Sequence, residues 1–217
     1  MVEISFSGLK MKIQLAMDSY KTLKSVVESP VYKVKGSKFL GFAYPVTTRE
    51  EVDLILKDLR NDHSKANHCC YAWNLGTEKQ EYRYNDDGEP ANSAGKPIYG
   101  QIQSFELTNV LIAVIRYFGG TKLGVGGLIQ SYREAARMAL ELGTVIEKEI
   151  KLPFCLEFDY PQMDRVMRLI REKQIEIASQ NMGLRVRMDI LVSKGKESAF
   201  HESLGQMHEV KLTERDS

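Results

Sequence analysis

The sequence of 217 residues is poor in cysteine and contains no long apolar run. Its three cysteines, Cys69, Cys70 and Cys155, are odd in number and lack framework spacing, which indicates reduced thiols rather than a disulfide scaffold. No stretch approaches the ~20 apolar residues of a membrane span, and the first residues lack a signal-peptide pattern. We therefore expect a cytoplasmic protein without membrane contact, in which residues 1–17 form an extension of uncertain start.

The chain also has almost no net charge, because 30 basic residues face 29 acidic ones. A nucleic-acid contact would therefore have to come from a local patch rather than from bulk charge. The hydrophobic fraction of 43% is that of an ordinary globular protein. A chain of this length can form one large domain or two small ones.

The first two thirds of the chain mix strand patterns with helix patterns. Thr47 or Thr48 is a suitable N-cap for an amphipathic helix that ends near Asp62. The run Asn109–Tyr117 is apolar almost throughout, which predicts a central strand buried on both faces. The other expected elements are strands at 25–34, 37–46, 66–75, 80–84 and 144–148, and helices that follow Ser93 and run from Leu128 to Gly143.

The pattern changes near residues 151–153. From there the expected order is strand, helix, strand, strand, helix, strand, which is the ferredoxin-like βαββαβ module. We therefore predict an α+β protein of two domains, residues 18–150 and residues 151–217.

A polar loop, Asp86–Pro97, concentrates carboxylates and turn-forming residues. Asp86, Asp87 and Glu89 lie within four positions and could bind Mg²⁺ or act in acid–base chemistry. A simple turn is the favoured interpretation, because Asp and Gly are standard turn formers and the ligand spacing of an EF-hand is absent.

The second half of the same loop is expected to enter a helix. Ser93 is a suitable N-cap, and Lys96 falls in the first turn. A helix N-terminus offers free N–H groups and the positive end of its dipole to an anion.

The glycine-rich segment Gly119–Gly127 lacks the fingerprints of known nucleotide-binding loops. Gly119 and Gly124 have the spacing of a Walker A motif, but Val125 and Gly126 stand where Lys and Ser or Thr are required. A dinucleotide-binding pattern fails as well, so we expect neither an ATP site nor an NAD site.

The segment nevertheless joins a predicted buried strand to a helix and carries basic side chains. The N–H groups of Gly119, Gly120 and Gly124, together with Arg116 and Lys122, could bind phosphate or an RNA backbone. Alternatively, the glycines serve tight turns and close packing. Both interpretations stay open on the residues alone.

His68, Cys69 and Cys70 raise the possibility of a metal or thiol site. On a strand His68 and Cys70 face one way and Cys69 the other, and a zinc site needs about four ligands. Buried thiols beside one histidine are the favoured interpretation, so we expect no metal and no cofactor.

Three blocks together resemble the hallmark segments of the IMPACT/YigZ family, in the same order. They are NHCCYAW (Asn67–Trp73), NDDGEPANSAGKPI (Asn85–Ile98) and IRYFGGTKLGVGGLIQSY (Ile115–Tyr132). The resemblance implies a ribosomal protein S5 domain 2-like fold for the first domain. It also implies a second domain similar to domain V of elongation factor G. Eukaryotic relatives regulate translation initiation by binding an activator protein and restraining a general-control kinase, whereas the two-domain layout here looks bacterial.

Three functions compete at this point. The leading hypothesis is a non-enzymatic binding protein that contacts RNA, the ribosome or a translation-associated protein, with no DNA sequence specificity. The second is an enzyme acting on a phosphorylated or peptide substrate, and the third is a protein–protein adaptor. The candidate binding residues are Lys96, Arg116, Gly119, Gly120, Lys122 and Gly124, and the candidate polar site comprises His68, Asp86, Asp87, Glu89 and Ser93. The enzyme hypothesis would use Asp86, Asp87, Glu89, His68 and Arg116.

Overall fold

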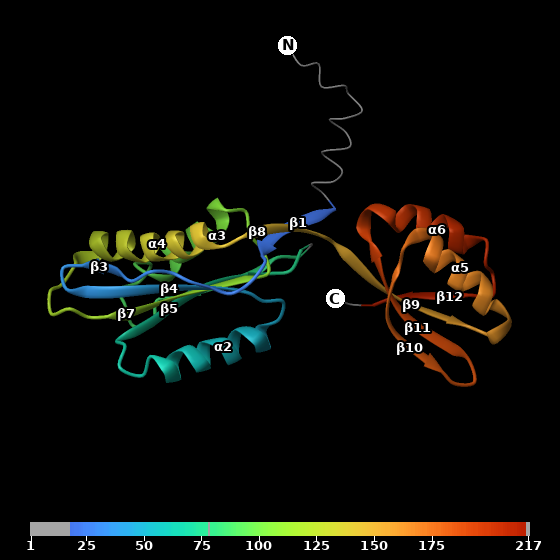
Figure 1. Cartoon of the computed structure of the whole chain (residues 1–217), viewed down its shortest axis with the longest axis horizontal. Helices are drawn as coiled ribbons and strands as arrows, with labels where there is room; N and C mark the ends of the chain where they lie inside the picture. Colours follow the sequence, from blue (N-terminus) through green and yellow to red (C-terminus); the bar gives the residue numbers. More distant parts are fainter. Residues whose placement is uncertain (1–17, 78, 216–217) are drawn as a thin grey trace, which may run out of the picture. The chain divides into compact units, whose positions relative to one another are not determined.

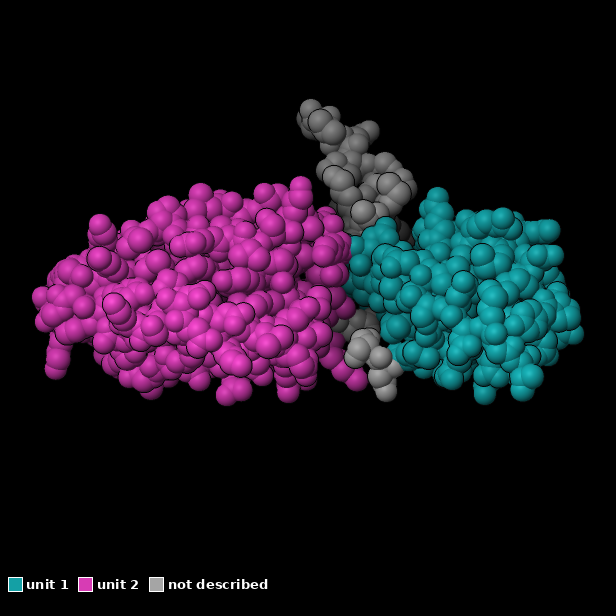
Figure 2. Space-filling view, turned by 60° about the horizontal axis from the view of Figure 1, so that its bottom comes forward, with its two compact units in different colours: residues 1–19, 149–217 teal, residues 20–148 magenta. Residues whose placement is uncertain are grey.

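The computed structural model describes residues 18–77 and 79–215. The chain divides into two compact units, one of residues 20–148 and one formed mainly by residues from 149 onward (Figures 1 and 2). Both units combine helices with sheets, which confirms the predicted α+β class. The extension expected at residues 1–17 lies outside the described residues.

The first unit is built on an antiparallel sheet with strand order β2-β4-β7-β5-β6, and β3 also pairs with β4. Helix α2 covers one face of the sheet, and helices α3 and α4 cover the other (Figure 1). The bounds are β2 (Val27–Glu28), β3 (Tyr32–Val34), β4 (Ser37–Pro45), α2 (Arg49–Asp62), β5 (His68–Leu75), β6 (Glu81–Asn85), α3 (Gly95–Ser104), β7 (Val110–Tyr117) and α4 (Gly124–Leu142).

Strand β7 is central and buried on both faces, as its apolar run predicts. Leu111 and Ile115 join the core under α2, whereas Ile112 and Val114 join the core under α3 and α4. Because strand side chains alternate between faces, a strand between two layers of helices is apolar at every position.

The N-cap prediction for α2 is confirmed. The Thr48 hydroxyl accepts a hydrogen bond from the Glu51 N–H, and the Glu51 carboxylate bonds back to the Thr48 N–H, which completes a capping box.

The structure corrects one strand prediction and adds one strand. The strand expected at 25–34 is interrupted around Pro30, which cannot donate a hydrogen bond to a sheet. Strand β1 (Ser19–Leu23), which pairs with β8 (Val145–Glu149), was not predicted. The predicted end of the helix at Gly143 is confirmed, because α4 ends at Leu142 and Gly143 is its C-cap, with φ −73°.

The second unit has the predicted βαββαβ order. Its sheet order β10-β11-β9-β12 is that of a ferredoxin-like module. No helix among residues 18–77 and 79–215 has the length and apolar character needed to cross a membrane. The bounds are β9 (Lys151–Phe158), α5 (Met163–Lys173), β10 (Glu176–Met182), β11 (Val186–Ser193), α6 (Glu197–Gly205) and β12 (Lys211–Glu214).

A backbone contact between two glycines ties the β3–β4 turn to the segment after β7. Gly36 has φ +80°, and a Cβ on Gly119 would lie 1.9 Å from the Gly36 carbonyl carbon. In contrast, a Cβ on Gly126 in the first turn of α4 would meet nothing within 4 Å. The glycine segment therefore contains both a required glycine and one that the fold does not require.

We expect Gly119→Ala to lower the free energy of unfolding by about 1–3 kcal/mol, because the added methyl group overlaps the Gly36 backbone. We expect Gly126→Ala to raise it by up to about 1 kcal/mol, because alanine favours the helix and loses less entropy on folding. Urea unfolding of both variants measures the difference. Equal effects of the two substitutions would contradict the packing assigned to Gly119.

Candidate functional site

The carboxylate loop begins with a tight turn. Asp87 has φ +44° and Gly88 has φ +85°, and the Glu89 N–H donates to the Asp86 carbonyl at 2.9 Å. Positive φ at both central positions is the pattern of a type I′ turn, in which Asp and Gly are favoured. The turn interpretation of residues 86–89 is therefore confirmed.

The Asp86 carboxylate caps helix α3. It accepts hydrogen bonds from the N–H groups of Asn92, Ala94 and Gly95, at 2.8, 2.9 and 2.8 Å. The N-cap predicted at Ser93 is wrong, because the buried Ser93 hydroxyl donates to the Pro90 carbonyl at 2.6 Å instead. An internal anion thus already occupies this helix N-terminus.

Asp87 is held from two sides. Its carboxylate accepts from Arg60 Nη2 at 2.8 Å and from the Cys69 N–H at 2.7 Å. Burial acts to raise the pKa of Asp87, but these two hydrogen bonds outweigh it, so the pKa lies below its ordinary value. Asp87 is therefore a structural anion that links the loop to α2 and β5.

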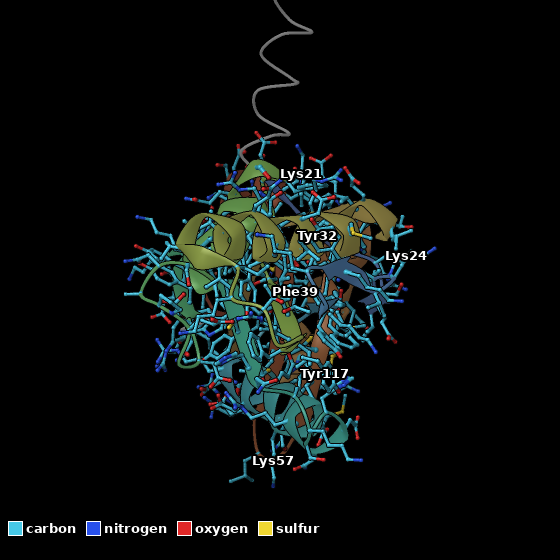
Figure 3. All side chains as sticks on the ribbon, turned by 90° about the vertical axis from the view of Figure 1, so that its left-hand side faces the viewer. Lys21, Lys24, Tyr32, Phe39, Lys57 and Tyr117 are labelled. Carbon is cyan, nitrogen blue, oxygen red and sulfur yellow. The ribbon has the colours of Figure 1, made fainter. Side chains whose placement is uncertain are left out.

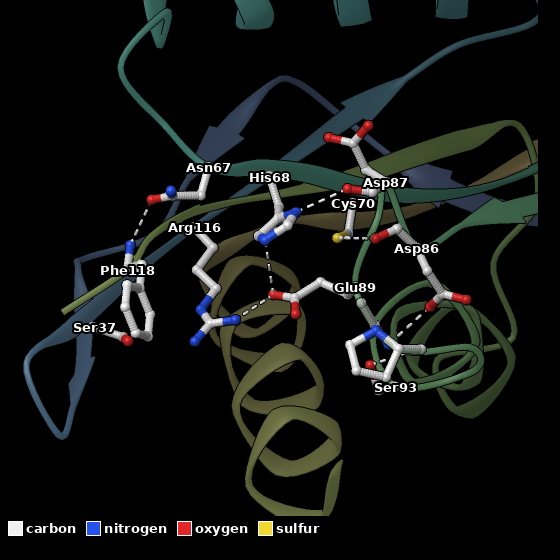
Figure 4. Close-up of polar contacts among 12 residues, drawn as sticks. Ser37, Asn67, His68, Cys70, Asp86, Asp87, Glu89, Ser93, Arg116 and Phe118 are labelled. Carbon is white, nitrogen blue, oxygen red and sulfur yellow. Dashed lines mark hydrogen bonds and ion pairs between the residues drawn. The ribbon is translucent and has the colours of Figure 1, made fainter. Parts of the chain in front are cut away.

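Glu89 is buried and forms the centre of a polar cluster (Figure 4). Its Oε1 atom accepts from Arg116 Nη1 at 2.5 Å and from the Tyr132 hydroxyl at 2.7 Å. Burial raises the pKa of Tyr132, so its hydroxyl stays protonated and available as a donor. This cluster joins the loop, strand β7 and helix α4.

Arg116 is enclosed rather than presented to solvent. Only 5% of the residue is exposed, and its guanidinium carbon lies 5.5 Å from the ring centroids of both Phe39 and Phe118. Ring faces attract cations, so both contacts favour the charged side chain. Arg116 was predicted to lie at an anion-binding surface, but its charge is matched internally by Glu89.

His68 completes the cluster. Its Nδ1 donates to the Asp87 carbonyl at 2.8 Å, and its Nε2 lies 3.8 Å from Glu89 Oε1. Cys70, on the same face of β5, donates to the Asp86 carbonyl at 3.1 Å, while Cys69 belongs to the core under α2. The predicted opposite orientation of the two thiols is confirmed.

Neither thiol is suited to nucleophilic catalysis. Burial raises the pKa of Cys69 to about 11 and raises that of Cys70 further. A cysteine needs its thiolate to act as a nucleophile or metal ligand. Within the described part of the chain, no group of three or more His, Cys, Asp or Glu side chains is arranged to hold a metal ion.

The glycine segment presents a different environment. Helix α4 begins at Gly124 without a side-chain cap and without an acidic residue in its first turn. Gly120 and Gly124 have φ of +85° and +72°, which turns of this kind require, and Lys122 between them is exposed. The N–H groups in the first turn of α4 thus have no side-chain cap and are close in sequence to a lysine. The corresponding N–H groups of α3 donate to the Asp86 carboxylate.

The fold brings His68, Asp87, Glu89 and Arg116 together but leaves Lys96 exposed on α3, outside the cluster. Sequence reasoning missed other members of the arrangement. Arg116 stands alone in an apolar strand, and a buried arginine requires a carboxylate partner, so the sequence could have predicted that a carboxylate such as Glu89 pairs with it. The missed residues are Arg60, Tyr132, Phe39 and Phe118.

The lowered pKa of Asp87 predicts a pH-dependent stability difference. At neutral pH Asp87→Asn should reduce the free energy of unfolding by about 1 kcal/mol, because charge-assisted hydrogen bonds are weakened. Asp87 stabilises fully above its unfolded pKa of about 3.9, and this contribution disappears as the pH falls through the lower folded value. Urea unfolding at several pH values should therefore show the difference from the wild type shrinking with acidity.

Asp53→Asn, at an exposed position of α2, is the matched control. A destabilisation by Asp87→Asn that is equal at every pH would contradict the assigned role of the Asp87 charge.

Comparison with known proteins places this chain in a family. The Impact N-terminal domain matches residues 35–140. An IMPACT family member of Haemophilus influenzae is 33% identical over 177 residues, which cover 79% of this chain and 84% of that protein. The IMPACT family member YigZ of Escherichia coli is 28% identical over 176 residues, covering 80% and 86%. A crystal structure described as a hypothetical protein has a TM-score of 0.74 and 25% identity, covering 92% and 98%. The chain belongs to the IMPACT family.

Proposed function

We propose that this chain is a non-enzymatic, translation-associated regulatory protein that contacts an RNA surface, such as that of the ribosome. Membership of the IMPACT family supports the translation-associated role. In this proposal residues 18–150 are the IMPACT-type domain, residues 151–217 are the elongation-factor-like module, and the protein works in the cytoplasm.

The observation that carries the non-enzymatic part is that the candidate catalytic groups already have internal partners. Asp86 caps a helix, Asp87 is bound by Arg60, and Glu89 is bound by Arg116 and Tyr132. A carboxylate or imidazole that acts as a general base must lie within hydrogen-bond reach of a substrate proton. Three carboxylates that each stabilise a different contact of the loop favour a structural role over catalysis.

The α4 N-terminus supports contact with phosphate. Its first turn has no acidic residue and no side-chain cap, so its N–H groups and dipole are available to an anion. Lys122 adds a positive charge beside them. Gly126 has no packing reason to lack a side chain, and a bare backbone lets a phosphate approach closely.

The remaining candidates contribute unequally to this surface. Lys96 is exposed on α3 and is a candidate for a separate phosphate contact. Gly120 and Gly124 shape the turn, and Gly119 serves the contact with Gly36. Arg116 is buried and contributes only indirectly, because its guanidinium group packs on the ring of Phe118, which is 45% exposed. The binding surface is thus smaller than the residue pattern predicts.

We expect Lys122→Ala to weaken binding of the full chain to ribosomes and to single-stranded RNA at low salt. Removing one lysine–phosphate interaction should reduce the slope of log affinity against log salt by about 0.7 for a single strand. Binding is measured by co-sedimentation and fluorescence anisotropy over a salt series, with nuclease-treated samples beside untreated ones.

Lys57→Ala is the control, because Lys57 lies on α2, on the far side of the sheet from α4 (Figure 3). It should leave both affinity and slope unchanged. Absence of RNA and ribosome binding at low salt, or equal effects of the two lysine substitutions, would contradict the proposal.

A further inference from the structure

The two edges of the six-stranded sheet differ in how they are protected. One edge consists of the very short strands β2 and β3, interrupted around Pro30. Short strands and proline are devices that prevent further strands from pairing. The other edge is β6, which pairs with β5 over five consecutive positions without a register shift. Only the β6 edge therefore has the regular geometry that another strand could extend.

Part of β6 is open. At its end Gly95 packs so tightly on Asn85 that a Cβ on Gly95 would lie 2.7 Å from the Asn85 nitrogen. Within the described part of the chain, the backbone of residues 81–84 pairs with β5 and with no other element. A segment of residues 81–84 thus keeps outward N–H and C=O groups for a partner strand.

One face of this edge carries an exposed aromatic cluster. Tyr82 and Tyr84 are 58% and 36% exposed, and both rings contact Tyr99 of α3, at centroid distances of 4.6 and 6.1 Å. Exposed aromatic side chains beside an open backbone edge are typical of recognition surfaces, because rigid rings bury a large area at little entropic cost.

The other face carries an uncompensated positive charge. Glu81 is bound by Arg49 at 2.5 Å, and Arg49 also lies over the Trp73 ring, so the Glu81 charge is neutralised. Arg83 lies opposite Trp73 in the β5–β6 register, is exposed, and has no ion-pair partner among the described residues. A strand added at this edge would therefore meet tyrosines on one face and a cation on the other.

We propose that β6 binds an extended peptide segment of a partner protein by strand addition. Because strand side chains alternate, the peptide residue facing Arg83 is acidic, and the residues on either side of it are apolar and pack on Tyr82 and Tyr84. This apolar–acidic–apolar chemistry defines the partner. The surface is separate from the α4 N-terminus, so the peptide site and the RNA contact succeed or fail independently.

The probe is a displayed library of random peptides selected on the full chain. We expect enrichment of the apolar–acidic–apolar pattern, and slower amide exchange of residues 81–84 when a selected peptide is added. Tyr82→Ala and Tyr84→Ala should each weaken the peptide about tenfold, as at interface anchor positions. Arg83→Glu should abolish binding, and a peptide with lysine in place of its acidic residue should restore it.

The control is Tyr160→Ala, which removes a tyrosine that is 48% exposed in the other unit and should leave peptide affinity unchanged. Lys122→Ala should also leave it unchanged, which separates this site from the RNA contact.

Several results would overturn the proposal. They are the absence of an enriched pattern, protection of a segment other than β6, and peptide binding that survives Arg83→Glu. Self-association of the chain that Arg83→Glu abolishes would identify a second copy as the occupant instead. Binding of oligouridylate that Tyr82→Ala abolishes would identify nucleic acid instead.

Discussion

The buried ion pair of Glu89 and Arg116 is the interaction on which the arrangement of the first unit depends. Burying two charges costs several kcal/mol per ion, and that cost is offset only when geometry and extra hydrogen bonds are favourable. Here the Tyr132 hydroxyl and two phenyl rings supply the additional contacts. Since Glu89 belongs to the loop, the pair holds the loop against β7 and α4. The type I′ turn before Glu89 then directs Asp86 to the start of α3 and Asp87 to Arg60.

This organisation gives a segment with the composition of a catalytic loop a structural role, which is the basis for the binding function proposed above. Each carboxylate bonds to another part of the first unit. Asp86 caps α3, Asp87 pairs with an arginine of α2, and Glu89 pairs with an arginine of β7. Two other features of the first unit face solvent. They are the start of α4, which has no side-chain cap and carries Lys122, and the edge strand β6. The polar cluster fixes the elements that carry both surfaces without being exposed in either. That division is consistent with the translation-associated role of the family and with the contact function that we propose.

Much of the fold could be predicted from local patterns, whereas the site depends on contacts that no local pattern contains. The apolar run of β7, the capping box at Thr48 and the βαββαβ order each follow from neighbouring residues. The cap of α3 could not be predicted in this way, because the Asp86 carboxylate accepts hydrogen bonds from the N–H groups of Ala94 and Gly95, eight and nine residues further along the chain. The strand at β8 was predicted, but its pairing with β1 was not, because the two strands lie far apart in the sequence. The sequence could predict that Arg116 needs a carboxylate partner, but it could not predict which carboxylate that is.

The most direct test of this account is a double-mutant cycle on the ion pair, using Glu89→Gln and Arg116→Met with urea unfolding. Each single substitution leaves one charge buried without its partner and should cost about 3–5 kcal/mol. The double substitution removes both charges and should be more stable than either single variant, with a coupling free energy of about 2 kcal/mol or more. Additive destabilisation, with coupling below about 0.5 kcal/mol, would contradict the claim that this pair holds the loop in place.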